Sequence, residues 1–258
     1  MRKLVILERE EEASLISLND EGSFNSLSEG LLKELFAALK EADEDHSTNV
    51  LILRGVGRGF SAGHNLKEVQ GNQDESFYRN LMACSKKVMT ILPNLNKPVI
   101  AEVHGVATAA GCQLVAACDL AYADTETKFA TPGVNIGLFC HTPLVSVSRT
   151  IAKKHSMEML LLGEMVEATE AKRFGLINDV FEPEELHERV MTVAKTISSK
   201  SSYILKLGKE TFYKQLNMSL EEAYEYASER MIKNLLAEDA KEGIDAFLNK
   251  RDPKWKNS

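Results

Sequence analysis

The chain has 258 residues and a formal net charge of -7 at pH 7, with 44% hydrophobic and 27% charged residues. This composition is ordinary for a globular protein, and the length is sufficient for one sizeable core. The acidic balance argues against a general nucleic-acid-binding surface, and no apolar run is long enough to span a bilayer. We therefore expect no nucleic-acid partner and no membrane partner.

Four cysteines, at positions 84, 112, 118 and 140, lie among apolar or small residues and lack the spacing of metal ligands. We expect free thiols in a reducing compartment and no metal site. The first residues are rich in acids and alternate apolar with polar side chains, unlike a secretory signal or a transit peptide. The expected location is the cytoplasm, or the mitochondrial matrix if a presequence was removed before this Met1.

The first hundred residues predict strands alternating with helices. Period-two alternation over residues 4–17 predicts two short strands joined by an acidic turn. Ser28 is the expected N-cap of a helix, and residues 49–55 form an apolar run typical of a buried strand. A helix is expected to begin near Asn65. A longer one is expected from 75 to 92, where Pro93 ends it.

The same cycle is expected to repeat with a strand over 97–105, a helix over 108–119 and a strand over 120–124. Residues 129–140 are expected to be mostly irregular, and 143–153 helical. From Glu184 onward nearly all residues follow a helical pattern. The prediction is an α/β core of strand–strand–helix units over residues 1–195, followed by a helical oligomerisation region over 196–258.

Two loops share an unusual design. In FSAGHNLKE and in GVATAAGCQLV a strand ends, small residues turn the chain, and a helix begins near His64 or Ala110. Each turn places unpaired main-chain N–H groups at a helix start, and the small side chains let a ligand approach the backbone. Two such donors on one oxygen would form an oxyanion hole. The alternative is that each loop is simply a tight turn between a strand and a helix.

Five segments occur together in a characteristic order and spacing: RGFSAGHNLKE, KPVIAEVHGVATAAGCQLVAACDLAYA, FATPGVNIGL, EAKRFGLINDV and EGIDAFLNKRDP. Through them the chain resembles the enoyl-CoA hydratase/isomerase (crotonase) superfamily along nearly its whole length. The resemblance implies a spiral of ββα units, with a helical C-terminal region that builds a homotrimer or a homohexamer. It implies an acyl-CoA thioester as ligand, with coenzyme A as part of the substrate and no separate cofactor.

The resemblance also assigns site residues. It places the two oxyanion N–H groups on His64 and Ala110. The residues implied to contact coenzyme A are Ala62, His64, Asn65, Leu66, Lys67 and Ala110, together with Lys250, which in some members reaches the coenzyme A of a neighbouring subunit.

The acid–base pair of the family's hydratases is missing. One of its two glutamates falls on Gln113 and the other on Gly133, and neither residue can exchange a proton near neutral pH. Because paired acid–base groups contribute orders of magnitude in rate, the usual hydration mechanism is not supported.

Histidine is the remaining neutral-pH acid or base. His141 lies at the position where other branches of the family carry a carboxylate, so it is the candidate substitute; the alternative is a polar loop histidine. His64 is expected to act through its N–H. His104 is expected to form a structural pair with Glu102, two residues earlier on the same strand face.

Three functions therefore stay open. The chain could be a lyase or isomerase of the hydratase/isomerase type that stabilises an enolate with non-standard acid–base residues. It could bind acyl-CoA without chemistry. It could also be an oligomeric scaffold.

Overall fold

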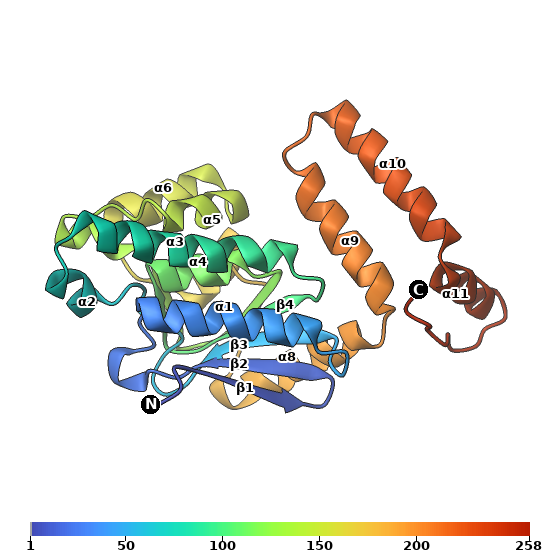
Figure 1. Ribbon diagram of the computed structural model, residues 1–258, viewed down its shortest axis with the longest axis horizontal. Coiled ribbons are helices and arrows are strands. Elements are labelled where there is room, and N and C mark those ends of the chain that lie inside the picture. Colours follow the sequence, from blue (N-terminus) through green and yellow to red (C-terminus); the bar gives the residue numbers. More distant parts are fainter. Residues whose placement is uncertain (1) are drawn as a thin grey trace.

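A computed structural model describes residues 2–258, and its centre is a six-stranded sheet (Figure 1). The spatial order is β1-β2-β3-β4-β6-β9, in which β1 and β2 are antiparallel and every later pair is parallel. The strands are β1 (Val5–Glu10), β2 (Ala13–Leu18), β3 (Val50–Gly55), β4 (Val99–Val103), β6 (Leu120–Asp124) and β9 (Asp179–Phe181).

A second, three-stranded sheet has the order β5-β7-β8, from β5 (Val106–Thr108), β7 (Lys128–Ala130) and β8 (Val166–Glu167). Isolated parallel bridges extend it sideways: Ser61 pairs with Ala107, and Leu27 pairs with His64. Successive chain segments thus each give one strand to the large sheet, a short stretch to the small sheet and then a helix. This repetition produces a spiral, and it brings equivalent turns of neighbouring units side by side.

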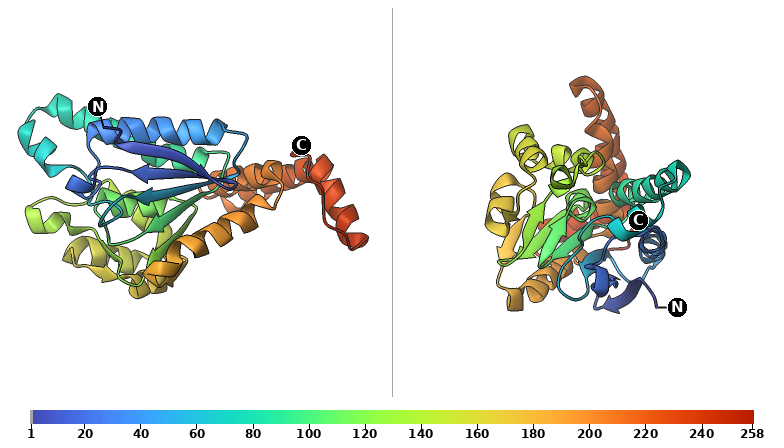
Figure 2. Two further views of the ribbon diagram at one scale, coloured as in Figure 1. Left: turned by 90° about the horizontal axis from the view of Figure 1, so that it is seen from below. Right: turned by 90° about the vertical axis from the view of Figure 1, so that its left-hand side faces the viewer.

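Helices cover both faces of the large sheet (Figure 2, left). The main core lies under α1, α3 and α4, whereas α8 covers a smaller core on the opposite face. The helices are α1 (Glu29–Glu44), α2 (Leu66–Gly71), α3 (Glu75–Ile91), α4 (Ala110–Ala117), α5 (Pro143–Thr150), α6 (Lys153–Leu162), α7 (Ala168–Phe174), α8 (Pro183–Ser198), α9 (Ser202–Gln215), α10 (Leu220–Leu236) and α11 (Glu238–Leu248). Short 3-10 turns are η1 (Glu21–Ser23), η2 (Leu92–Asn94) and η3 (Pro132–Ile136).

The predicted start signals hold at the first helices. Ser28 accepts a hydrogen bond from the Leu31 N–H at the start of α1, and Asn65 accepts from Lys67 and Glu68 at the start of α2. The helix expected over 108–119 is shorter, because Thr108 belongs to β5 and α4 begins only at Ala110. The helix expected over 143–153 ends at Thr150, and α6 follows it as a separate helix.

The last three helices extend away from the core (Figures 1 and 2). In the single chain their apolar side chains are largely uncovered: Phe247 is 83% exposed, Leu220 77% and Tyr224 70%. No residue of α10 is buried. Burying apolar surface of this kind is favourable. None of the helices in residues 2–258 combines the length and apolarity that crossing a membrane requires.

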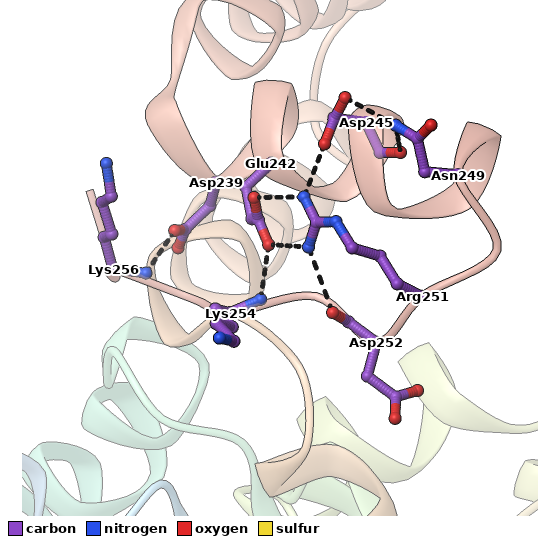
Figure 3. Close-up of polar contacts among 8 residues, drawn as sticks. All are labelled: Asp239, Glu242, Asp245, Asn249, Arg251, Asp252, Lys254 and Lys256. Carbon is purple, nitrogen blue, oxygen red and sulfur yellow. Dashed lines mark hydrogen bonds and ion pairs between the residues drawn. The ribbon is translucent and has the colours of Figure 1, made fainter.

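The end of the chain folds back onto α11 (Figure 3). Asp239 is buried, and its carboxylate accepts hydrogen bonds from the Ser201 hydroxyl and from the N–H groups of Lys256 and Asn257. Arg251 pairs with Glu242 and lowers the pKa of Glu242 to about 2. Asp239 of α11 thereby links the tail to Ser201, in the segment that joins α8 to α9.

Candidate functional site

The turns that carry His64 and Ala110 are joined by main-chain hydrogen bonds. The Ser61 N–H donates to the Val106 carbonyl at 3.0 Å, and the Thr108 N–H donates to the Ser61 carbonyl at 2.9 Å. These bonds belong to the bridge between Ser61 and Ala107 in the small sheet. Two loops that are more than forty residues apart in the sequence therefore lie against each other.

Glycines allow this close approach. Gly63 has a φ of +86°, and a Cβ atom added to it would lie 2.9 Å from the Thr108 carbonyl oxygen and 3.0 Å from the Ala110 nitrogen. A Cβ added to Gly111 would lie only 2.2 Å from the Ser61 carbonyl oxygen. Any side chain at either position would push the two turns apart. The residue before His64 is thus in direct contact with the backbone at Ala110.

Ala109 directs the second turn. Its φ of 50° and ψ of -118° are unusual for a residue with a side chain, and its own N–H donates to the Ala130 carbonyl at 2.8 Å. Such a conformation costs on the order of 1–3 kcal/mol, and strained residues cluster at active sites and ligand-binding loops. It turns the next peptide so that α4 can begin at Ala110.

The main-chain N–H groups of His64 and Ala110 donate to no acceptor among residues 2–258. Ala110 is the first residue of α4, so its N–H has no partner inside that helix. The structure brings these two predicted donors into adjoining turns, as the sequence analysis expects.

Gln113 lies one turn along α4 from Ala110 and lines a groove of about 1360 Å³. The groove runs between α3 and α5 over α4, toward α9. Gln113 is 4% exposed, and its Oε1 has no hydrogen-bond partner among residues 2–258. The neutral amide therefore lies at the edge of the two turns, with an unused buried acceptor.

Gly133, the other position without an acid, has its space already filled. A Cβ atom there would lie 2.9 Å from the Leu138 carbonyl oxygen and 3.0 Å from the Cys140 sulfur. The backbone of residues 138–140 has closed over the position. Burial raises the pKa of the neighbouring Cys140 thiol and that of Cys112, the latter to about 12, so both stay protonated at neutral pH.

The two histidines differ in environment. His141 is exposed, and its ring packs against Phe139 at 5.3 Å between centroids, so the structure does not place its side chain in the groove. The His64 ring is partly buried, and burial lowers its pKa, which keeps the imidazole neutral at pH 7. The role of His141 as a substitute acid or base stays a prediction.

The other predicted ligand contacts surround the start of α2. Ala62, Leu66 and Lys67 are exposed, and Asn65 is half-buried as the helix cap. Lys250 is exposed and follows α11, a helix on the opposite side of the molecule from α2 (Figure 1). Within one chain it is therefore not brought together with the other predicted site residues.

Two polar clusters escaped the sequence analysis. Glu102 does not pair with His104; instead Nδ1 of His187 on α8 donates to the Glu102 carboxylate at 2.9 Å, and the His104 ring contacts the Gly57 carbonyl at 2.8 Å. The expected pair is wrong because α8 brings His187 from a distant part of the sequence. No part of residues 2–258 gathers three or more His, Cys, Asp or Glu side chains in an arrangement suited to a metal ion.

The second cluster lies at the groove, which Asp119 and Tyr213 line. Asp119 follows α4, and its carboxylate accepts from Lys209 at 2.7 Å and from the Tyr213 hydroxyl at 2.8 Å. Both donors lie on α9, so this cluster fixes the first helix of the C-terminal part to the core. The sequence alone gives no sign of this contact, because Asp119 and its two partners lie about ninety positions or more apart.

Comparison with known proteins identifies the family. Residues 8–258 match the sequence profile of the family described as enoyl-CoA hydratase/isomerase. The chain belongs to this family. Within the enoyl-CoA hydratase/isomerase family, the mitochondrial enoyl-CoA hydratase domain-containing protein 3 of Rattus norvegicus is 45% identical over 231 residues, which are 90% of this chain and 77% of that protein. The Homo sapiens protein of that name is 43% identical over 240 residues, or 93% and 79% of the two chains.

Solved structures of family members agree. A crystal structure of an enoyl-CoA hydratase from Mycobacterium smegmatis is 41% identical and superposes with a TM-score of 0.96, covering 98% of this chain and 99% of that one. The crystal structure of human enoyl-CoA hydratase domain-containing protein 3 is 42% identical with a TM-score of 0.95, covering 98% of this chain and 100% of that one. The two-sheet α/β crotonase fold with a helical C-terminal region is therefore confirmed.

Proposed function

We propose that this chain binds an acyl-CoA thioester, places the thioester oxygen between the N–H groups of His64 and Ala110, and stabilises an enolate-like form of the acyl group. The observation that carries the proposal is the contact between the two turns, with Gly63 against the Ala110 backbone and both donors free. Main-chain donors held in position cost no reorganisation when negative charge develops on the oxygen.

The proposal requires no charged side chain at the oxygen. The partial positive charge at the start of α4 adds to the two N–H groups. Burial lowers the pKa of His64, so its ring is neutral and adds no charge of its own near the oxygen. Ala62, Asn65, Leu66 and Lys67 are proposed to contact the coenzyme A portion at the start of α2.

A thioether analogue tests the oxyanion contact. Replacing the thioester carbonyl by a methylene group removes the oxygen and leaves the rest of the acyl-CoA intact. We expect calorimetry to show that the thioether binds about 10- to 100-fold more weakly, because it loses one or two hydrogen bonds to a buried oxygen. Equal affinities would contradict the placement of the oxygen, and no binding of either compound would remove acyl-CoA as the ligand.

A binding protein without chemistry is the second candidate, and a specific observation favours it. Gln113 has no ionisable group, and residues 138–140 fill the space at Gly133. Because of that filling, restoring both glutamates would not rebuild a hydratase without a shift of the 138–140 backbone. Gln113→Glu alone is the cleaner test, since it adds one base at a position that already faces the groove.

The exchange of α-protons separates the two candidates. In deuterated water, an enolate-stabilising site with a base exchanges the protons next to the thioester carbonyl. We expect Gln113→Glu to accelerate this exchange in bound acyl-CoA while leaving crotonyl-CoA hydration undetectable.

Efficient hydration of crotonyl-CoA by the wild-type chain would refute the interpretation of Gln113 and Gly133. Loss of any wild-type exchange in His141→Ala would identify His141 as the base; unchanged exchange would remove it.

We further propose that the C-terminal region, residues 196–258, assembles a homotrimer or homohexamer. The uncovered apolar side chains of α9 to α11 support this, because burying them against another subunit is favourable. A neighbouring subunit could then bring its Lys250 to the coenzyme A. Mass measurement in solution tests the assembly. The Rattus norvegicus and Homo sapiens relatives carry the word mitochondrial in their names, and for this chain we propose the cytoplasm or the mitochondrial matrix.

A further inference from the structure

The helix α11 ends in a Schellman motif that places Lys250 in a strained conformation. The Lys250 N–H donates to the Phe247 carbonyl at 3.2 Å, and the Arg251 N–H donates to the Ala246 carbonyl at 3.0 Å. Lys250 has a φ of +52°, in the left-handed region, where glycine is the usual residue because a Cβ atom is strained there. A lysine at this position therefore makes the chain less stable than a glycine would.

The Lys250 side chain gains no contact in its own chain that offsets this strain. It is exposed, and its ammonium group forms no ion pair with any carboxylate of residues 2–258. Strained backbone conformations cluster where a side chain has a function, such as ligand-binding positions. The strain at Lys250 is therefore consistent with a contact that lies outside its own chain.

Residues 251–257, which we call the strap, follow Lys250 and are bound to α11 (Figure 3). The Arg251 guanidinium donates to the Glu242 carboxylate at 2.6 and 2.9 Å and to Asp245 at 2.6 Å. The Lys254 N–H donates to Glu242 at 2.7 Å. The side chains of Arg251 and Asp245 are 40% and 60% exposed, so their ion pair adds little stability. A guanidinium fork nevertheless fixes direction well, so Arg251 contributes geometry more than free energy.

The rest of the strap is held where α8 joins α9. Trp255 Nε1 donates to the Ser199 carbonyl at 2.8 Å. The Trp255 ring contacts α11 at Gly243, where an added Cβ atom would lie 3.2 Å from it. Asp239 accepts from two N–H groups of the strap and from the Ser201 hydroxyl. The strap thus fixes the residue before it, Lys250, relative to both α11 and the α8–α9 segment.

We infer that the strap positions Lys250 for the phosphate groups of a coenzyme A bound by a neighbouring subunit, and that Arg251 is a positioning residue for this contact. The inference rests on the proposed function and on the proposed assembly. Coenzyme A carries its phosphates in its nucleotide part, and a lysine ammonium binds phosphate as a point charge. Arg251 acts through Lys250 and does not itself touch the ligand.

Calorimetry with an acyl-CoA and with the matching acyl-pantetheine, which lacks all the phosphates, tests the inference. We expect Lys250→Gly to weaken acyl-CoA binding by about 5- to 20-fold, the loss of one partly exposed charged contact. The same variant should unfold at a higher urea concentration, because glycine relieves the strain. Since it is expected to be more stable, a failure to fold cannot explain its weaker binding.

Arg251→Met tests the positioning role. It should weaken acyl-CoA binding by about 3- to 10-fold, leave acyl-pantetheine binding unchanged, and have no further effect in a chain that already carries Lys250→Gly. Arg251→Lys keeps the charge but loses the fork, so it should not restore the affinity. An Arg251→Met effect that is equal for both ligands, or that persists beside Lys250→Gly, would overturn the inference.

Two matched variants serve as controls. Glu11 also has a positive φ, 50°, in the turn between β1 and β2, so Glu11→Gly should raise the urea midpoint without changing acyl-CoA binding. Arg173 pairs with Glu170 on α7 through two hydrogen bonds, and Arg173→Met should leave acyl-CoA binding unchanged.

The wild-type chain separates the two levels of the argument. If it binds acyl-CoA no more tightly than acyl-pantetheine, or if Lys250→Gly binds acyl-CoA as tightly as wild type, the inference is wrong and the proposed function stands. If wild type binds neither ligand, the proposed function itself fails.

Discussion

Replacing Gly63 by alanine perturbs the contact between the two turns directly. The added methyl group would meet the Ala109 Cβ at 2.8 Å, the Thr108 oxygen at 2.9 Å and the Ala110 nitrogen at 3.0 Å. Real Cβ atoms do not approach other atoms so closely, and two of these three are backbone atoms. The turns must separate, and the Ala110 N–H must change its direction relative to His64.

The expected cost has two parts. A residue with a side chain in the left-handed region costs about 1–2 kcal/mol. Forcing a methyl group into a filled space costs about 1–3 kcal/mol more. A small gain from the stiffer unfolded chain, about 0.4–1 kcal/mol, opposes them. We expect Gly63→Ala to reduce the free energy of unfolding by about 2–4 kcal/mol, from the sum of these effects.

Gly175→Ala separates the strain from the clash. Gly175 has nearly the same φ, +84°, but no atom lies within 4 Å of its added Cβ. This control should cost only about 1 kcal/mol. Urea unfolding gives both values, and calorimetry with an acyl-CoA gives the affinities. We expect weaker acyl-CoA binding in Gly63→Ala and unchanged binding in Gly175→Ala. If both variants bind equally well, the close contact of the turns is not what positions the ligand.

Two further perturbations follow from single residues. Ala109→Gly relieves the unusual φ of 50° and should raise the free energy of unfolding by about 1 kcal/mol, measured by urea unfolding; a loss of stability would show that this conformation carries no strain. For His187, burial lowers the pKa, but hydrogen bonds and charge attraction from Glu102 and Glu10 outweigh it and raise the pKa overall. The stabilisation by the protonated ring is then complete below about pH 6.5 and is lost as the pH rises through the folded-state pKa. The melting-temperature difference between wild type and His187→Gln should therefore shrink toward alkaline pH; a difference independent of pH would contradict this.

Local signals made much of the core predictable. The capping oxygens of Ser28 and Asn65 and the apolar run before Gly55 correspond to an observed helix start or strand, because each depends on neighbours within a few residues. The start of α4 was misplaced by two residues. Thr108 belongs to β5 because it pairs with Ala130 of β7, a partner more than twenty residues away in the sequence.

The sequence predicted which positions belong to the site, but not the shape of the space around them. Small residues in two turns and the family resemblance indicated His64 and Ala110. The identity of Gln113 and Gly133 could be read directly, yet only the three-dimensional structure shows that Cys140 and Leu138 fill the space at Gly133.

Isotope-edited infrared spectroscopy tests the central claim most directly. A ¹³C label at the thioester carbonyl of an acyl-CoA isolates one stretching band, whose frequency falls when hydrogen bonds polarise the carbonyl. The account predicts a clear shift to lower frequency on binding to the wild-type chain, and a smaller shift on binding to Gly63→Ala. The opposite result is a band of the bound thioester at the same frequency as that of the free thioester in a water-free solvent. It would show that neither N–H reaches the oxygen.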